Sequence, residues 1–441
     1  MSERVERLLH VMPAEGSSAR PFAWFVPGRI EVLGKHTDYA GGRSLLCAVE
    51  RGFLIVTRAR DDGRVRLHSL ADAATFNAQL TELQRAPAGE WFVYPSTVLR
   101  RVTQNFPSAT RGFDAVFESD LPPAGGLSSS SALITAVFLV FAAVNRLETT
   151  DSWREALVTR EALAGYAASI ENGQSFGRLE GERGVGTSGG SEDHVAILCC
   201  RADTLSQYAF SPVRREAHVP FPAHLTFAVA VSGVVARKTG NAMAQYNRAA
   251  KLARRALEHW NARSRRTDSS LADAIRHAGA AGVGEVLGRV GDPEFTAGEL
   301  RDRVDQFAVE SESLVPAGSR QLESGDTTGF GDTVARSQQL AERILRNQVP
   351  ETSVLVDSAR ENGAVAASAF GAGFGGSVWA LVDRDDAPKF LKRWKGAYER
   401  AFPGRIVAST FFLTRPAPAA FEVGRPPKAG RYDYEQTTRS T

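Results

Sequence analysis

The stretch PGRIEVLGKHTDYAGG, residues Pro27–Gly42, constrains the fold of this chain more than any other. It begins as an apolar, strand-like run and then concentrates polar side chains between glycines. These side chains are Arg29, Lys35, His36, Thr37, Asp38 and Tyr39. Polar groups crowded at the end of a buried strand cost desolvation, so they are usually present to hold a ligand. An exposed loop between two strands explains the stretch about equally well, and the stretch alone leaves both interpretations open.

Composition limits the class of protein. The 441 residues suffice for two or three domains, and the 53 basic and 50 acidic residues indicate neither nucleic acid nor an anionic membrane as a partner. Three cysteines, Cys47, Cys199 and Cys200, lie in apolar runs and cannot form a disulfide framework. The first residues lack the apolar segment of a signal peptide, and the longest apolar run, 132–144, is too short to cross a bilayer. We therefore expect a cytoplasmic protein.

Hydrophobic patterns divide the chain into a β-rich first part and a helix-rich second part. Strand patterns occupy 22–33, 44–60, 113–119, 204–211, 225–232, 377–382 and 406–413, and the longer helical patterns occupy 91–105, 132–144, 152–170, 242–262, 328–346, 352–362 and 387–402. Residues 311–322 are partly helical, with a break expected at Pro316. Residues 212–224 are a plausible crossing between domains. We predict an N-terminal extension (1–21), two domains (22–211 and 212–413) and a disordered tail (414–441).

A glycine- and serine-rich cluster, PPAGGLSSSS at residues 122–131, lies between a strand and the apolar helix. Its backbone amides therefore fall at a helix N-terminus, where glycines let the backbone approach phosphate and the helix dipole favours an anion. A serine hydroxyl there can reach a magnesium ion. A tight turn capped by one serine leaves the other three unexplained, so the pattern favours phosphate binding. The chain contains no G-x-x-x-x-G-K-[ST] motif and no protein-kinase motif set.

Two further clusters complete the polar pattern. The run GAGFGG, residues 371–376, matches G-x-G-x-x-G, but a strand pattern rather than a helix pattern follows it. We interpret it as a loop that packs against the first two clusters and lets two backbone segments approach closely. Glu171 at a helix end and the segment 189–194 supply acids, and phosphoryl transfer needs a carboxylate on magnesium and another near the attacking hydroxyl. Solvated surface acids are the alternative, and position alone does not choose between Glu192 and Asp193.

Together these clusters resemble the GHMP kinase superfamily and, within it, the galactokinase family. The opening stretch is similar to that family's signature, GGLSSSS to its second motif, and residues 369–378 to its third. Trp91-x-x-Tyr94 resembles a W-x-N-Y segment, 170–172 an A-E-N helix end, and 231–248 the segment that carries a sugar-side tyrosine. The resemblance implies two α+β lobes, an N-terminal lobe like ribosomal protein S5 domain 2 and a C-terminal ferredoxin-like lobe, with the active site between them.

The resemblance also implies roles for matching residues. Asp193 and Arg29 fall on catalytic positions, and Ser130 with Glu171 on magnesium-holding positions. Sugar-contacting positions correspond to Lys35, His36, Asp38, Gly190 and Tyr246. Positions beside ATP correspond to Trp91, Tyr94, Gly125, Gly126, Leu127, Ser128, Ser129, Ser130 and Gly373. The implied reaction transfers the ATP γ-phosphate to the anomeric (C1) hydroxyl of galactose or a C6-modified relative.

Three departures from the family pattern matter. Lys35 stands where galactokinases place a glutamate that reaches the sugar's C6 hydroxyl, and a cation there would favour a carboxylate, as in galacturonate. Alternatively Lys35 turns to solvent or pairs with a local acid, and galactose specificity is intact. The loop from Glu171 to Asp193 is longer than the family's, and SEDH replaces its M-D-Q context. Residues 368–370 lack the arginine common before the third motif.

We therefore expect a cytoplasmic sugar-1-kinase with ATP as co-substrate and Mg²⁺ as cofactor. A regulator that binds ATP and sugar without turnover is one alternative, although retention of Arg29, Ser130, Glu171 and Asp193 argues for catalysis. Another small-molecule kinase of the superfamily, such as a mevalonate or homoserine kinase, is disfavoured by the H-T-D-Y element and the Tyr246 segment. We expect no nucleic-acid or membrane partner. The sequence leaves the oligomeric state open, and a monomer is compatible with it.

Overall fold

The structure is a computed structural model. It describes residues 1–441 except 14–18, 88–89, 124, 235–240 and 425–441, and it does not describe the side chains of 241–243. The helices are α1 Ser2–Val11, α2 Val93–Asn105, α3 Ser129–Asn145, α4 Asp151–Ala156, α5 Arg160–Asn172, α6 Glu192–Cys199, α7 Asn241–Ser264, α8 Leu271–Leu287, α9 Ala297–Ala308, α10 Val315–Ser324, α11 Thr327–Leu340, α12 Pro350–Glu361 and α13 Ala387–Ala401. The strands are β1 Phe22–Leu33, β2 Arg43–Arg60, β3 Arg64–Ser69, β4 Thr75–Gln79, β5 Gly112–Ser119, β6 Thr204–Phe210, β7 Val213–Pro220, β8 Leu225–Val231, β9 Ala366–Phe370, β10 Ser377–Asp383, β11 Thr410–Thr414, β12 Pro416–Ala417 and β13 Phe421–Glu422.

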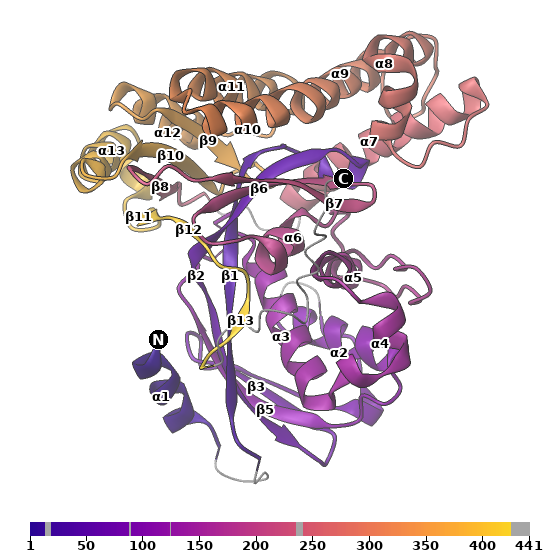
Figure 1. Ribbon diagram of the computed structural model, residues 1–441, viewed down its shortest axis with the longest axis vertical. Coiled ribbons are helices and arrows are strands. Elements are labelled where there is room, and N and C mark those ends of the chain that lie inside the picture. Colours follow the sequence, from indigo (N-terminus) through magenta and orange to yellow (C-terminus); the bar gives the residue numbers. More distant parts are fainter. Residues whose placement is uncertain (14–18, 88–89, 124, 235–240, 425–441) are drawn as a thin grey trace, which may run out of the picture.

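The N-terminal lobe is built on a nine-stranded sheet whose main path runs β13-β1-β2-β5-β3-β4. The long strand β2 organises it, because β1, β5, β6 and β12 all pair with it. Helices α2 to α6 cover one face, and α1 packs on the other against β2 and β5 (Figure 1). Helix α3 is apolar on every side and is accordingly buried over nearly its whole length.

The C-terminal lobe is built on a four-stranded antiparallel sheet of order β11-β8-β10-β9. Side chains of β8 and β10 alternate between its faces, as a strand's period of two requires. Small residues such as Ala228 and Ala380 pack beneath α12 and α13, whereas Val229 and Trp379 join the core shared with the N-terminal lobe. The indole of Trp379 donates to the carbonyl of Glu31, 3.2 Å away on β1. The two lobes therefore share a continuous core.

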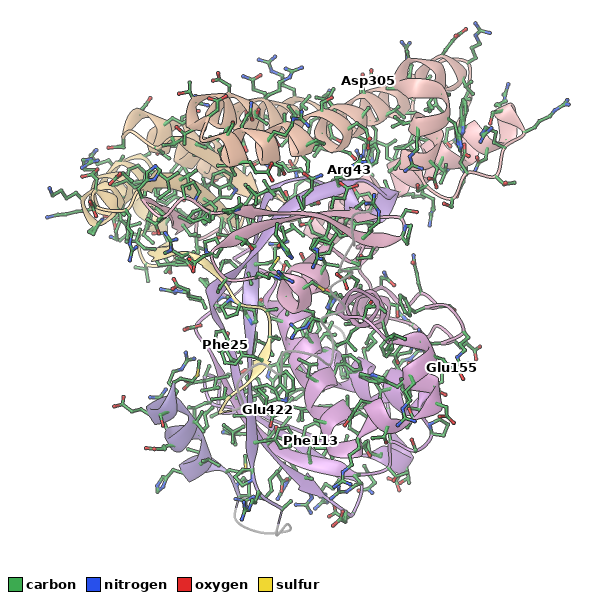
Figure 2. The ribbon with its side chains drawn as sticks, viewed as in Figure 1. Phe25, Arg43, Phe113, Glu155, Asp305 and Glu422 are labelled. Carbon is green, nitrogen blue, oxygen red and sulfur yellow. The ribbon has the colours of Figure 1, made fainter. Side chains whose placement is uncertain are left out.

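Helices α7, α8 and α9 project from the C-terminal lobe at the upper right of Figure 1. They have a small apolar core of their own, which includes Trp260 and Phe307. Ala40 and Tyr39, from the loop after β1, pack against this core. Figure 2 places Arg43 at the junction below these helices, where its guanidinium pairs with Glu216 and Glu312. The helical extension thus holds the end of the opening stretch in place.

The predicted α+β character is confirmed, but four details of the prediction are wrong. The pattern at 152–170 forms two helices, because Thr159 caps the start of α5. No break occurs at Pro316, because a π-helical turn at Val309–Leu314 shifts the hydrogen-bond register and accommodates a residue without an amide hydrogen. Residues 213–220 form β7, a hairpin partner of β6, so the predicted boundary at residue 212 falls inside the N-terminal sheet.

The tail is the fourth correction. It was predicted to be disordered from residue 414, yet β12 pairs with β2 and β13 pairs with β1. Ala417, Ala419 and Ala420 are buried, so these small apolar residues gain burial against the N-terminal lobe. Residues 425–441 of the predicted tail lie outside the described residues. Among the described residues, no helix is both long and apolar enough to cross a membrane.

Candidate active site

A cavity of about 680 Å³ lies where the three polar clusters of the sequence meet. The opening stretch contributes Arg29, Glu31, His36, Asp38 and Tyr39 to its lining. The serine cluster contributes Gly126 and Ser128–Ser130, the acidic segment contributes Glu171, Gly189, Gly190, Glu192 and Asp193, and the glycine run contributes Gly371–Gly373, Gly375 and Gly376. Because these segments belong to both lobes, the cavity exists only in the assembled chain.

Arg29 and Asp193 form an ion pair on the cavity wall. The Nε and Nη2 atoms of Arg29 lie 2.8 and 2.7 Å from Oδ1 of Asp193, and Nη1 donates to the carbonyl of Gly126. Arg29 is 4% exposed. Its burial alone would lower the pKa of Arg29, but Asp193 and then Glu192 raise that pKa above its usual value. The guanidinium therefore stays charged and is held at the junction of the strand, the serine cluster and α6.

The hydroxyl of Ser131 brings two carboxylates together. It lies 2.7 Å from Oε2 of Glu171 and 3.2 Å from Oδ2 of Asp193. Nε2 of His194 is 2.9 Å from the same oxygen of Glu171, and the Thr135 hydroxyl is 3.1 Å from Nδ1 of His194. This chain of contacts fixes the direction of the Glu171 carboxylate. Ser131 was not among the predicted site residues, since the four adjacent serines could not be told apart by sequence.

The donor set suits a magnesium ion. Ser130, Glu171 and Asp193 all line the cavity and offer only oxygen atoms, which Mg²⁺ prefers. No cluster of three or more His, Cys, Asp or Glu residues able to hold a metal ion was found within the described part of the chain. A magnesium ion here would thus complete its shell with substrate phosphates and water, as this small, reluctantly dehydrated ion does in other phosphoryl-transfer sites.

The serine cluster lies at the start of α3 and lines the cavity. Ser128 has φ +60° and precedes the helix, and its buried hydroxyl oxygen has no hydrogen-bond partner among the described residues. Ser129 and Ser130, in the first helical turn, line the cavity. The first amides of an α-helix lack intrahelical partners, and here they open toward the cavity at the positive end of a 17-residue dipole. The arrangement can bind a phosphate group.

The glycine run packs on this cluster, as predicted. A Cβ added to Gly371 would lie 3.0 Å from the carbonyl oxygen of Gly126, and φ at Gly371 is +81°. The Ser377 hydroxyl donates to the carbonyl of Gly125. A Cβ on Gly373 would lie 2.3 Å from the carbonyl oxygen of Asn347. Glycine is required here because the two loops meet backbone to backbone.

Three side chains of the predicted sugar side, those of His36, Asp38 and Tyr246, line the same cavity. The ring centroids of His36 and Tyr246 are 5.5 Å apart, and Asp38 accepts a hydrogen bond from the amide of Glu192 at 3.2 Å. Burial, with a smaller contribution from Arg303, lowers the pKa of His36 to about 4, so its ring is neutral near pH 7. Nε2 of His36 lies 3.2 Å from both the carbonyl oxygen of Ala372 and Nδ2 of Asn347, and Nδ1 lies 2.9 Å from the Tyr39 hydroxyl.

Several predicted contacts are not among the residues that line the cavity. Trp91 is partly buried and packs edge-on against Phe92 and Phe117, whereas Tyr94 does line the cavity. Leu127 is 1% exposed and supports the serine cluster from within, and Gly125 contributes the carbonyl that Ser377 binds. A role of Trp91 beside ATP therefore stays a prediction that no contact in the structure supports.

Lys35 likewise does not line the cavity. Its Nζ atom donates to the hydroxyls of Ser337 and Ser368, at 3.1 and 2.7 Å, and the residue is 1% exposed. Ser337 in turn donates to Glu310. The lysine is turned inward rather than toward solvent, and its charge acts on nearby acids. Ser368 belongs to the segment that lacks the family's arginine, so two of the three sequence departures contact each other in the structure.

Comparisons with known proteins agree with this site. Residues 14–59 match a family model described as "Galactokinase galactose-binding signature". Residues 93–200 match the model "GHMP kinases N terminal domain", and residues 319–400 match the model "GHMP kinases C terminal". The galactokinase of Streptomyces coelicolor is 28% identical over 382 residues, covering 86% of this chain and 89% of the relative. That of Roseiflexus sp. is 28% identical over 405 residues, covering 90% and 91%.

Solved structures show the same fold. A Lactococcus lactis galactokinase complexed with galactose superposes with a TM-score of 0.76 at 21% identity, covering 95% of this chain and 99% of the other. A mevalonate kinase gives a TM-score of 0.54 at 14% identity, covering 89% and 98%. The two-lobed α+β fold, the serine cluster and the cavity between the lobes thus define a GHMP kinase. Within that superfamily the chain belongs to the galactokinase family, and it is an ATP-dependent sugar kinase.

Gly190 offers a test of the sugar side. A Cβ at this position would lie 2.5 Å from Oδ2 of Asp38 and 2.7 Å from the amide nitrogen of Tyr39, which cannot move aside. We expect Gly190→Ala to weaken sugar binding by about tenfold or more, since overpacking of this kind costs 1–3 kcal/mol. Titration calorimetry measures this, with Gly404→Ala as the matched control because a Cβ there meets nothing within 4 Å. Unchanged sugar affinity in Gly190→Ala would show that Asp38 and Tyr39 do not belong to the sugar site.

Proposed function

We propose that this protein transfers the γ-phosphate of ATP to the anomeric (C1) hydroxyl of galactose or a closely related hexose. The observation that carries the proposal is the Arg29–Asp193 pair, which lines the same cavity as the serine cluster and the residues His36, Asp38 and Tyr246. A nucleotide phosphate at the first site and a sugar at the second would meet at this pair. The names of the relatives, galactokinases with similar sequence and fold, support the choice of sugar.

The chain's own groups would act by positioning and by charge. Asp193 would orient the sugar hydroxyl and accept its proton late, because an aspartate of ordinary pKa near ~4 is a weak base toward a hydroxyl. Arg29 would neutralise charge on the phosphate in a loose transition state, where positioning and electrostatics dominate. Ser130 and Glu171 would hold Mg²⁺, which when bound supplies further neutralisation of phosphate charge.

An assay of ADP release across galactose, galacturonate, glucuronate, N-acetylgalactosamine and arabinose tests the proposal. Phosphorus NMR of the product then distinguishes an anomeric phosphate from a phosphate on another hydroxyl. Turnover of a hexose to its 1-phosphate is expected. ATP-dependent sugar binding without release of ADP from any of these sugars would contradict it and favour a binding protein.

The choice between galactose and galacturonate turned on Lys35, and its contacts favour a structural role. Buried beside Ser337 and Ser368, it offsets the charges of Glu31 and Glu310. A lysine that received a sugar carboxylate would be expected to face the cavity. The contacts of Lys35 therefore support galactose, or another hexose without a carboxylate, over galacturonate.

We expect Lys35→Met to lower the free energy of unfolding by about 3 kcal/mol, because it leaves buried carboxylates without their cation. Urea denaturation measures this loss. Turnover of galacturonate relative to galactose should not fall in this variant, whereas a lysine that binds the sugar's carboxylate requires a selective loss of galacturonate. Lys35→Arg, which keeps the charge in a larger group, separates lost charge from disturbed packing.

A further inference from the structure

Glu31 is a buried acid on the cavity wall that the proposed mechanism does not use. It lies two residues after Arg29 on β1, so both side chains face the same side of the sheet. Glu31 is 3% exposed and lines the cavity. Its Oε1 atom has no hydrogen-bond partner among the described residues. An acceptor left unpaired in a buried site costs free energy unless a ligand completes it.

Glu192 lies beside Glu31 and adds a second carboxyl group to this part of the cavity wall. Its Oε2 accepts from the hydroxyl of Ser44 at 2.7 Å, and its Oε1 is 3.8 Å from Nε of Arg29. The two glutamates are close enough to share a hydrogen bond. Burial raises the pKa of Glu31 to about 7, against the lowering effect of Lys35 and Arg29, and burial raises that of Glu192 well above its usual value. Burial therefore disfavours the charged form of both carboxyl groups, and a hydrogen-bond donor on a bound ligand would offset that cost for Glu31.

Acidic side chains outnumber basic ones among the described residues that line the cavity. Its described lining includes the carboxyl groups of Glu31, Asp38, Glu171, Glu192 and Asp193. Arg29 is the one lysine or arginine among the described lining residues, and Asp193 and the Gly126 carbonyl already engage it. Near neutral pH the His36 ring carries no charge, and Lys35 is held elsewhere by two hydroxyls. The described lining of the cavity thus offers many acceptors, and its one arginine is already engaged.

We propose that Glu31 is a specificity-determining residue whose carboxyl group accepts a hydrogen bond from the sugar, so that the site selects a neutral or amino-substituted hexose and rejects a uronic acid. This inference rests on the proposed function for the place of the sugar. Because Glu31 lines the cavity and the last torsion of a glutamate side chain is broad, a modest rotation of the side chain can present a carboxyl oxygen to a bound sugar. A sugar hydroxyl or ammonium would supply the missing donor, whereas a sugar carboxylate has no hydrogen to donate and would add negative charge to a cavity lined by Asp38 and Asp193.

Binding measurements test this directly. Calorimetric titration of the full chain with galactose, 2-amino-2-deoxygalactose and galacturonate gives affinities that do not depend on turnover. We expect galacturonate to bind at least about tenfold more weakly than both other sugars, because like charges in a buried site are strongly disfavoured. In Glu31→Gln the ratio of galactose affinity to galacturonate affinity should fall by about tenfold. This is the change in affinity that the loss of one hydrogen bond to a charged group produces.

Glu310→Gln is the matched control. Glu310 is fully buried, interacts with the Lys35 segment and also has one oxygen without a partner among the described residues, yet it does not line the cavity. Its substitution should change the unfolding midpoint and leave the sugar preference unchanged. If Glu31→Gln does not fold, Glu31→Asp serves instead. The shorter side chain retains the charge but retracts the acceptor, so galactose binding should weaken while galacturonate stays rejected.

The possible outcomes separate the two proposals. Equal or tighter binding of galacturonate by the unsubstituted protein overturns the role of Glu31, and so does an unchanged preference in a folded Glu31→Gln variant. Discrimination that depends on Glu31 without release of ADP supports the role of Glu31 and overturns the proposed reaction. Release of ADP together with discrimination that does not depend on Glu31 supports the proposed reaction and overturns the role of Glu31. Failure of all three sugars to bind overturns both.

Discussion

Asp193→Asn should lower kcat for sugar phosphorylation by about 100- to 10,000-fold, the range over which a positioned acid–base group contributes. The amide has nearly the shape of the carboxylate but cannot accept the proton that leaves the sugar hydroxyl. Sugar affinity should change far less, because His36, Asp38 and Tyr246 are untouched. Steady-state ADP release and calorimetric sugar titration separate the two effects. Near-normal turnover of Asp193→Asn would rule out the assigned role.

Loss of the ion pair with Arg29 could also disturb the fold of this variant, so its thermal unfolding midpoint is the necessary companion measurement. Asp332→Asn is the control for the chemical change itself, since Asp332 is exposed on α11. It should leave both kcat and the midpoint unchanged. A large fall in kcat at an unchanged midpoint then assigns the effect to chemistry.

Arg29→Met should lower kcat by about 100- to 1,000-fold, since preorganised charge stabilisation of a transition state is worth this much in other sites. Arg29→Lys keeps the charge but loses the forked geometry that contacts Asp193 and the Gly126 carbonyl together, and should recover only part of the rate. Rapid-quench measurement of the first turnover reports the chemical step in both. A full rate in Arg29→Lys would show that only the charge matters.

Arg60 provides the matched control for this pair of variants. It is a buried arginine bound to an aspartate, Asp114, at 2.8 Å, but it does not line the cavity. Arg60→Lys should change stability and leave the rate of the chemical step unaltered. If Arg60→Lys slowed the chemical step as much as Arg29→Lys, the effect of Arg29 would be a general loss of packing.

The sequence predicted what local chemistry determines. Gly371 needs a positive φ and a close backbone contact, and a glycine-rich run reveals that need without a structure. For the serine cluster before an apolar helix, an anion site is the interpretation that accounts for more than one of its serines, and it stays a prediction. Arg29 and Asp193 came from the resemblance to the family, and the structure brings them into contact although 164 positions separate them.

Other features depend on contacts that no local pattern encodes. Ser130 and Ser131 differ by one helical position, and only the phase of α3 decides which hydroxyl reaches Glu171. Glu31 is a single acid within an apolar strand pattern, and no motif in the sequence marks it as a site residue. The direction of Lys35 depends on Ser337 and Ser368, which lie some 300 positions further along the chain. Long-range partners of this kind become visible only in the folded molecule.

The two short strands β12 and β13 also set an order of events during synthesis. They are the last described strands of the chain, yet they complete the sheet of the lobe that is synthesised first. A nascent chain therefore carries an unfinished β1 edge until β13 has been synthesised, and an unpaired edge invites wrong pairing. A stop codon just after β11 would leave every residue of β1 and β2 in place, but it would remove two strands that pair with them.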